Sequence, residues 1–214
     1  MVSDRHGAGT AGETPGMIRW CLHATPCGVL RLGAFGGRLC LCDWADVPAR
    51  DFVVRRLERG LHVRFAEWPN ERLRPGTGLP GIPAEPESNF PDNPDDADRC
   101  VLDRAVRQLD EYFAAQRRVF DVPLLTVGTP FQRAVWELLT EIPFGGTRSY
   151  AWLAAQLGHP RAVRAVAAAN RANALSIFIP CHRVVGSDGS LTGYAGGLAA
   201  KRLLLGLEQQ QLLR

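Results

Sequence analysis

Residues 69–98 contain seven prolines and several acidic side chains, and they divide the chain into two parts with different patterns. Proline fixes its own backbone angle φ and lacks an N–H donor, so a stretch this rich in proline excludes a regular helix or strand. We therefore expect a long acidic surface loop over 69–98. The regular elements of the fold must come from the residues on either side of it.

The residues before this loop have the pattern of β-strands. Apolar side chains alternate with other residues, as at Leu39 and Leu41, and this predicts strands over 17–22 and 28–44. The two glycines at 36–37 predict a hairpin turn. The first half of the chain is therefore expected to contain a β-hairpin.

Helical patterns dominate the rest of the chain. Apolar positions recur at helical spacing over 98–118, and a short helix is also expected near 47–59. Two further helices are predicted to begin after Thr129 and Ser149, because both residue types cap helix N-termini. Another helix is predicted over 159–173. The last two helices are short and joined by a tight turn, which makes them a candidate helix-turn-helix.

The helix predicted over 159–173 is basic on one side. We expect it to begin at Pro160, since proline fits the first helical position. At 100° per residue, one side consists of Arg161, Arg164, Ala168 and Arg171. The side expected to pack on the preceding helix consists of Val163, Val166 and Asn170. Arginine pairs with phosphate and stacks on bases, so the two helices together favour nucleic-acid binding over an ordinary solvated surface.

The charge of the chain supports the same partner. Residues 1–128 contain 16 Arg and 18 Asp or Glu, a net charge of −2, whereas residues 129–214 contain 9 Lys or Arg and 4 Asp or Glu, a net charge of +5. A positive second half is suited to contact a polyanion.

The sequence carries no signal for a membrane or for secretion. No apolar run approaches the roughly 18 residues that a membrane-spanning helix needs. Residues 1–16 are polar and rich in glycine, unlike a signal peptide, and we expect them to form a disordered tail. The expected location is therefore cytoplasmic.

Six cysteines are present, and most of them predict free thiols. Five lie in the first half at spacings that fit no disulfide framework and include no C-x-x-C pair. A zinc site made of Cys21, His23 and Cys27 is an alternative, but the spacing is not typical of metal ligands. We expect no metal and no cofactor.

Cys181 differs from the other cysteines in its neighbours. A lone cysteine is most often a small buried apolar residue. His182 and Arg183, however, bring positive charge or hydrogen-bond donors close to the thiol, and these favour the nucleophilic thiolate. Glu208 lies in a leucine-rich helix predicted over 198–212. Its carboxylate either faces solvent or orients the histidine, and spacing alone leaves both open.

Several motifs of the second half together resemble those of the O6-alkylguanine-DNA alkyltransferases, also called methylated-DNA–protein-cysteine methyltransferases. The matching motifs are GTPFQRAVW, IPFGGTRSY, RAVRAVAAANRAN, IPCHRVV and GSLTGYAGGLAAK. They extend over about 128–210 with almost no gaps, and PCHRV followed by GYAGG is highly specific. The first half resembles the N-terminal domain of this family more weakly.

The resemblance implies an α/β (α+β) fold with two domains. Residues 17–122 would form a ribonuclease-H-like domain with an antiparallel sheet, and the loop over 69–98 would belong to it. Residues 123–214 would form a helical, DNA-binding alkyltransferase domain that contains the helix-turn-helix. The boundary between the domains is expected between about 119 and 128.

The resemblance also implies a reaction. An alkyl group would move irreversibly from O6-alkylguanine in DNA, and from O4-alkylthymine, to Cys181. His182 would act as the base through a bound water and would be held by Glu208. Arg164 would fill the space left by the flipped guanine. Tyr150 would push on the phosphate of that nucleotide.

The remaining roles follow from the same resemblance. Asn173 would join the DNA-recognition helix to the active-site strand. The substrate pocket would consist of Tyr194, Ala195, Gly196 and Gly197. The partner would be double-stranded DNA containing alkylated guanine, bound by a monomer, and cooperative binding along DNA is left open.

The sequence departs from the family at two places, and three other functions are alternatives to alkyl transfer. Ala167, Ala168 and Ala174 stand where the family often has glycine or proline, which leaves the strength of DNA binding open. The chain could instead be a non-catalytic lesion-binding module, although such proteins lack the acceptor cysteine. A damage-sensing helix-turn-helix regulator would need further domains. A Cys–His hydrolase would turn over repeatedly.

Overall fold

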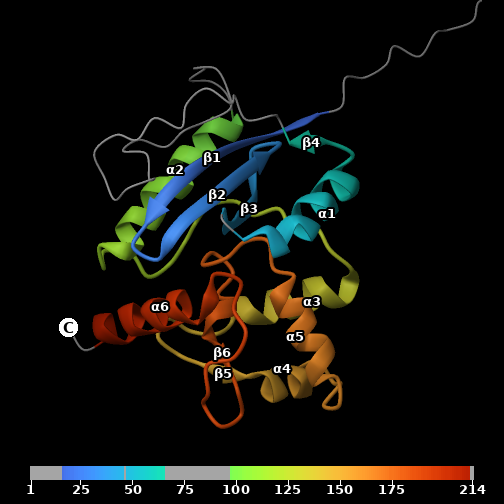
Figure 1. Ribbon diagram of the computed structural model, residues 1–214, viewed down its shortest axis with the longest axis vertical. Coiled ribbons are helices and arrows are strands. Elements are labelled where there is room, and N and C mark those ends of the chain that lie inside the picture. Colours follow the sequence, from blue (N-terminus) through green and yellow to red (C-terminus); the bar gives the residue numbers. More distant parts are fainter. Residues whose placement is uncertain (1–15, 46, 66–96, 213–214) are drawn as a thin grey trace, which may run out of the picture.

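The computed structural model describes residues 16–45, 47–65 and 97–212, and it has a mixed α/β fold (Figure 1). The expected tail over 1–16 and the expected loop over 69–98 lie almost entirely outside these residues. A sheet forms one layer of the molecule, and a group of helices lies below it. Among the described residues, no helix has the length and apolar character that crossing a bilayer requires.

The sheet contains the strands that alternation predicts and one further strand of two residues that it does not predict. Its members are β1 (Met17–Thr25), β2 (Gly28–Phe35), β3 (Arg38–Trp44) and β4 (Arg64–Phe65), in the order β3-β2-β1-β4. The first three pair antiparallel, and β4 runs parallel to β1. The predicted hairpin turn at 36–37 is confirmed, since both of its glycines adopt positive φ angles of 59° and 70°.

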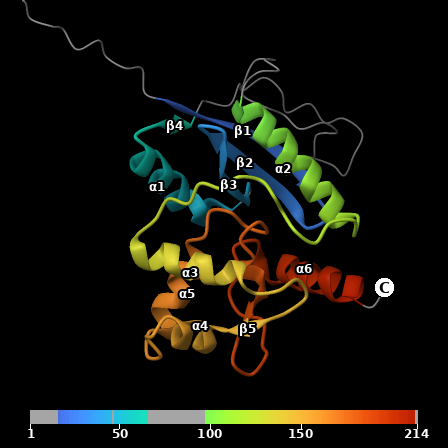
Figure 2. The same cartoon turned by 180° about the vertical axis from the view of Figure 1, so that it is seen from behind.

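The remaining elements are mostly helical. They are η1 (Pro48–Arg50), α1 (Asp51–Leu61), α2 (Ala97–Phe113), α3 (Pro130–Thr140), β5 (Arg148–Ser149), α4 (Tyr150–Gln156), α5 (Val163–Arg171), η2 (Cys181–Arg183), β6 (Val184–Val185) and α6 (Gly197–Leu212). Helix α2 packs across one face of the sheet, as the view from behind shows (Figure 2). Helices α3 to α6 gather below the sheet in Figure 1.

The predicted helix starts at Thr129 and Ser149 are confirmed by their caps. Thr129 Oγ1 accepts a hydrogen bond from Gln132 N at 3.2 Å, and Gln132 Oε1 accepts one from Thr129 N at 3.0 Å, which is a capping box. Ser149 Oγ accepts a hydrogen bond from Trp152 N at 3.1 Å. These side chains satisfy backbone donors that the first turn of a helix leaves free.

Two predicted boundaries are wrong. The helix expected from Pro160 begins only at Val163, because residues 159–162 form a turn in which Ala162 N donates to His159 O at 2.8 Å. Arg161 therefore lies in this turn and not on the helix. The helix expected over 98–118 ends at Phe113, and Ala115 follows in the left-handed region at a φ of 63°.

The edge of β3 is covered by segments from the second half of the chain. Cys42 N donates to Ala174 O at 2.7 Å, and Ser176 N donates to Cys42 O at 2.7 Å. Farther along the strand, Leu125 N donates to Leu39 O at 2.8 Å. Pairing of this kind protects an edge strand from other chains. It also fixes the segment that leads to Cys181 against the sheet.

Candidate active site

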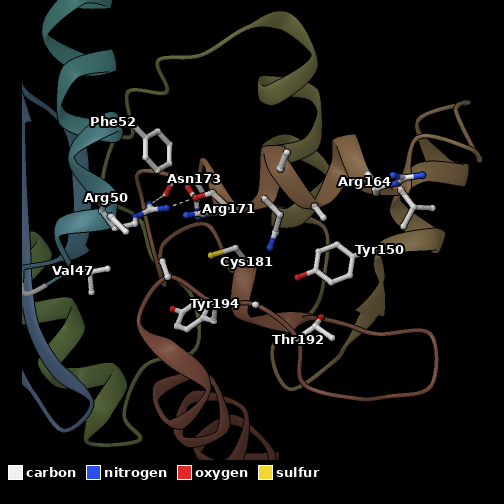
Figure 3. Close-up of a pocket in the computed structure, with 17 residues that line it drawn as sticks. Val47, Arg50, Phe52, Tyr150, Arg164, Arg171, Asn173, Cys181, Thr192 and Tyr194 are labelled. Atoms are coloured by element: carbon white, nitrogen blue, oxygen red, sulfur yellow. Dashed lines mark hydrogen bonds between the residues drawn. The ribbon is translucent and has the colours of Figure 1, made fainter.

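A cavity of about 920 Å³ opens beside Cys181 (Figure 3). Tyr150 and Arg164 line it on one side, and Val47 and Phe52 line it on the opposite side. The elements that form it are far apart in sequence, since η1 and the start of α1 contribute to it together with α5 and the loop before α6. Its volume lies within the range of pockets that hold small molecules.

Cys181 lies on the wall of this cavity at the start of η2. It is 3% exposed. Asn173 follows α5, and its side chain links that helix to the segment before the cysteine. Its Nδ2 donates to Ile179 O at 3.0 Å, and its Oδ1 accepts from Leu175 N at 2.9 Å. The position of the thiol is therefore coupled to the end of α5.

The Cys181 thiol is protonated at rest. Burial raises its pKa, and hydrogen bonding from Asn173 and the positive charges of Arg50 and Lys201 oppose that rise only in part. A buried thiol of this kind needs a base before it can act as a nucleophile.

His182 is placed to supply that base. Its ring is fully buried, and Nε2 lies 2.9 Å from Glu208 Oε1. A carboxylate accepts hydrogen bonds, so this contact assigns the proton to Nε2 and leaves Nδ1 with a free lone pair. Nδ1 is buried and has no hydrogen-bond partner among the described residues. Burial lowers the pKa of His182, so the ring is neutral and able to accept a proton.

Glu208 is buried and contacts His182. Of the two positions that spacing left open for its carboxylate, in solvent or beside the histidine, the structure has the second. Arg183 Nε and one terminal nitrogen of the same guanidinium donate to its two oxygens at 2.9 Å each. Tyr112 Oη and Gly145 N also donate to it at 2.9 Å. Although burial raises the pKa of Glu208, the hydrogen bonds from His182 and Arg183 lower it to about 2. The carboxylate therefore stays ionised and holds the imidazole in one orientation.

The loop before α6 closes the cavity with an aromatic ring. Tyr194 packs edge-on against Trp44 with the ring centroids 5.9 Å apart, and its buried hydroxyl has no hydrogen-bond partner among the described residues. Lys201 Nζ fixes this loop by donating to Thr192 O at 2.7 Å and to Val184 O at 2.5 Å. Burial lowers the pKa of Lys201 to about 8.

The four residues expected to form the substrate pocket do not all reach the cavity. Tyr194 and Ala195 line it, whereas Gly196 and Gly197 do not. Gly196 packs against Trp44, where an added Cβ would lie 2.2 Å from the indole ring. Gly197 begins α6 with a φ of +82°. Both glycines shape the loop around the cavity.

Helix α5 divides into the two sides that its periodicity predicts. The exposed members are Arg164, Ala168 and Arg171, and all three also line the cavity. Arg161 is exposed but lies outside the lining. Val166 and Asn170 are buried, as the periodicity predicts, but Asn170 and the half-buried Val163 also line the cavity, so the two sides of the helix are not fully separate. Basic side chains therefore surround the entrance beside the thiol.

Sequence reasoning missed a buried ion pair next to the cavity. Arg50 Nε donates to Asp43 Oδ2 at 2.7 Å, and the same guanidinium donates to the backbone oxygens of Arg171 and Asn173. The two charged residues are 5% and 4% exposed. Neither residue belongs to a sequence motif. The pair could have been suspected only from the general rule that a charge buried in a protein interior needs a partner.

The zinc alternative finds no support in the geometry. The parts of the chain that the structure describes bring together no group of three or more His, Cys, Asp or Glu side chains suited to a metal. His23 Nε2 instead lies 2.9 Å from Asp110 Oδ1. Cys21 and Cys27 are free thiols.

Comparisons with known proteins identify close relatives. A family model described as "6-O-methylguanine DNA methyltransferase, DNA binding domain" matches residues 130–210. The methylated-DNA–protein-cysteine methyltransferase of Methanosarcina barkeri is 54% identical over 108 residues, which are 50% of this chain and 68% of that protein. The constitutive methylated-DNA–protein-cysteine methyltransferase of Bacillus subtilis is 53% identical over 109 residues, 50% of this chain and 66% of that protein.

Solved structures extend the similarity to the first half of the chain. The crystal structure of Mycobacterium tuberculosis OGT in complex with DNA has a TM-score of 0.63 and 35% identity, and covers 89% of this chain and 92% of that one. The crystal structure of M. tuberculosis O6-methylguanine methyltransferase has a TM-score of 0.64 and 34% identity, with 91% and 94% covered.

Proposed function

Because this chain belongs to the methylated-DNA–protein-cysteine methyltransferases, it repairs DNA by transferring alkyl groups to one of its own cysteines, and we propose that Cys181 is the acceptor. The observation that carries this assignment is the position of the thiol. Among the described residues that line the cavity, Cys181 is the only cysteine, and a buried histidine–carboxylate pair follows it.

The reaction begins with a proton. His182 Nδ1 takes the thiol proton of Cys181 through a bound water, and the ionised Glu208 stabilises the imidazolium. The thiolate sulfur attacks the alkyl carbon, a carbon–sulfur bond forms, and the bond from that carbon to guanine O6 breaks. The electron pair stays on the guanine, which takes up a proton as it leaves. A phenol such as that of Tyr194 is suited to donate it, and the proton that His182 took from the thiol then replaces the one that the phenol gave.

The product explains why one molecule repairs one lesion. A thioether is a poor leaving group, and no step of the reaction restores the thiol. The protein is therefore consumed stoichiometrically, which distinguishes it from a Cys–His hydrolase.

DNA is bound through α4 and α5, which we assign as the helix-turn-helix. Arg164, Arg171 and Ala168 are exposed on α5, and Arg161 stands in the turn before it. The alkyl group lies inside a base pair, so the guanine must leave the stack. Arg164 fills the space that it leaves, and Tyr150 pushes on its phosphate. O6-alkylguanine in double-stranded DNA is the main substrate, and O4-alkylthymine is a second one.

The assigned domains are residues 17–122, ribonuclease-H-like, and residues 123–214, which carry the chemistry. Both parts of the chain line the cavity, so no second copy is needed to complete it, and we propose that the protein acts as a monomer.

The acceptor is tested by mass. The protein is incubated with duplex DNA that carries O6-methylguanine, and we expect one added methyl group, located on Cys181 by peptide mapping. The variant Cys181→Ala should gain none. Cys42→Ala is the control, because Cys42 is also buried but lies outside the cavity. Normal methyl transfer by Cys181→Ala would overturn the assignment.

A further inference from the structure

Helix α1 has a basic side to which the reaction above gives no role. Phe52, Arg55, Arg56 and Arg59 recur on this side at helical spacing. Arg55 and Arg59 are exposed, and neither forms an ion pair with another described residue. Arg59 Nε donates to Arg55 O at 3.1 Å, which holds its side chain along the helix. We call Arg55, Arg56 and Arg59 the basic face of α1.

The acidic residues of α1 do not neutralise this face. At 100° per residue, Asp51 and Glu58 lie about a quarter-turn or more away from its middle. Glu58 Oε1 instead accepts a hydrogen bond from Phe65 N at 3.3 Å, on the side of α1 that meets β4. The basic face is therefore left with its positive charge.

Arg56 adds a partly buried charge to the same face. Its guanidinium lies 5.1 Å from the centroid of the Trp136 ring on α3, and its Nε and one terminal nitrogen are buried without a hydrogen-bond partner among the described residues. Burial lowers its pKa to about 10, so the side chain still carries its charge at neutral pH. A charge that lacks a compensating partner in the protein raises the positive potential over this face, and an anion bound outside would stabilise it.

The basic side of α1 begins at the mouth of the cavity. Phe52 lines the cavity opposite Arg164 and Tyr150 (Figure 3). The mouth therefore lies between two basic elements, with α5 on one rim and α1 on the other. From Phe52 to Arg59 the helix rises by about 10 Å, which is the axial length of about three nucleotides of one DNA strand.

We propose that Arg55 and Arg59 bind backbone phosphates of the DNA beside the flipped nucleotide, which makes α1 a second DNA-binding surface next to α5. The inference rests on the proposed function, in which α5 holds the DNA over the mouth of this cavity. The backbone of a nucleotide that enters the mouth continues on both sides of it, so the phosphates on one side lie toward α1. Arginine binds phosphate well, and such contacts hold the duplex without reading its sequence.

The salt dependence of DNA binding tests these contacts. The dissociation constant for an unmodified duplex is measured by fluorescence anisotropy between about 50 and 200 mM salt, where each bound phosphate contributes to the slope of log K against log salt. In Arg55→Ala, Arg59→Ala we expect the slope to fall by about 2 and binding at physiological salt to weaken by about tenfold or more. Both positions are exposed and alanine favours helix, so this variant should fold.

Two further double variants separate phosphate binding from other effects. Arg38→Ala, Arg107→Ala is the matched control, because it removes the same net charge at two exposed arginines of β3 and α2. It should keep the wild-type slope. Arg55→Lys, Arg59→Lys keeps the charge of the basic face and should retain most of the slope, which a structural role specific to arginine does not predict.

The loss should appear in binding and not in the transfer step. With saturating methylated duplex, the single-turnover rate of Arg55→Ala, Arg59→Ala should equal that of the wild-type protein, and it should fall only at low DNA concentration. A slope equal to that of the matched control would overturn the proposal. If self-association in ultracentrifugation were lost while the slope stayed unchanged, the basic face would instead bind a second copy of the chain. A wild-type protein that binds no duplex DNA would contradict the proposed function itself.

Discussion

At the scale of single residues, the proposed reaction depends on the protonation states of three buried side chains. In that reaction Cys181 loses a proton, His182 accepts it, and Glu208 stays ionised beside them. Burial raises the pKa of the thiol and lowers that of the imidazole, so both groups are neutral at rest. Transfer therefore starts from an uncharged pair, which is the form that a dry interior favours.

The relay predicts a pH dependence. The pKa of His182 lies below its ordinary value of 6.5. The neutral, basic form of the ring therefore persists below pH 6.5, and we expect the single-turnover rate of methyl transfer to fall only as the pH falls through the lowered value.

The carboxylate of Glu208 gives a second prediction for the relay, in which it stabilises the imidazolium. In Glu208→Gln we expect the single-turnover rate to fall about 100-fold at neutral pH. The control is Glu141→Gln, an exposed carboxylate at the end of α3. Equal rates in both variants would rule out the relay.

The sequence predicts this site only in part. Cys181 and His182 are adjacent, and the motif that contains them is enough to propose both. Glu208 is 26 residues away from His182. Whether its carboxylate faces solvent or contacts the histidine depends on how α6 packs, which the spacing does not show. Tyr112 and Arg50 could not be predicted at all. Each is an ordinary residue of its own element and reaches the site only through long-range contacts.

At the scale of elements, α5 lines the cavity, and we propose that it also contacts the DNA. Its exposed side carries the arginines, and its buried side carries Asn170 and packs on α3 and α4. Periodicity predicts these two sides correctly because they depend only on 3.6 residues per turn. The predicted start of the helix is wrong, because the turn after Gly158, whose φ is +74°, uses the residues up to Ala162.

Arg164 gives a prediction for this element. We propose that Arg164 offsets the cost of flipping, so we expect Arg164→Ala to slow transfer from methylated duplex DNA by about tenfold or more. Transfer from the free O6-alkylguanine base should be unchanged, since a free base needs no flipping. Arg133→Ala, which removes an exposed arginine of α3, is the control. An equal loss on duplex and free base would show that Arg164 acts elsewhere.

At the scale of the whole molecule, the sheet and the site form one unit. The edge of β3 pairs with residues 174–176, Arg50 binds the end of α5, and Tyr112 of α2 donates to Glu208. The sequence predicts β1 to β3 and most helices from local patterns, but not the short strands β4, β5 and β6. It does not predict these contacts, because they join positions about 100 residues apart that no local pattern relates. Through them, the first half of the chain supports the position of the thiol.

The ion pair of Asp43 and Arg50 allows this coupling to be measured. Arg50→Met removes the hydrogen bonds to the end of α5 and leaves Asp43 buried without its partner. We expect a loss of about 3–5 kcal/mol in the free energy of unfolding, measured with urea. The double variant Asp43→Asn, Arg50→Met should lose less, because no unpaired charge remains. A double variant that is less stable than Arg50→Met would contradict this account.

The same single variant has a predictable pH dependence. Burial raises the pKa of Asp43, and Arg50 opposes that rise, so removing Arg50 raises the pKa further. A carboxyl whose pKa is higher in the folded than in the unfolded state stabilises the fold at low pH, and that stability is lost as the pH rises through the folded value. The deficit of Arg50→Met relative to the wild-type protein should therefore grow from acid to neutral pH. In the double variant the stability deficit should not grow with pH in this way, because asparagine does not titrate. Urea unfolding of the single and the double variant at several pH values measures the difference.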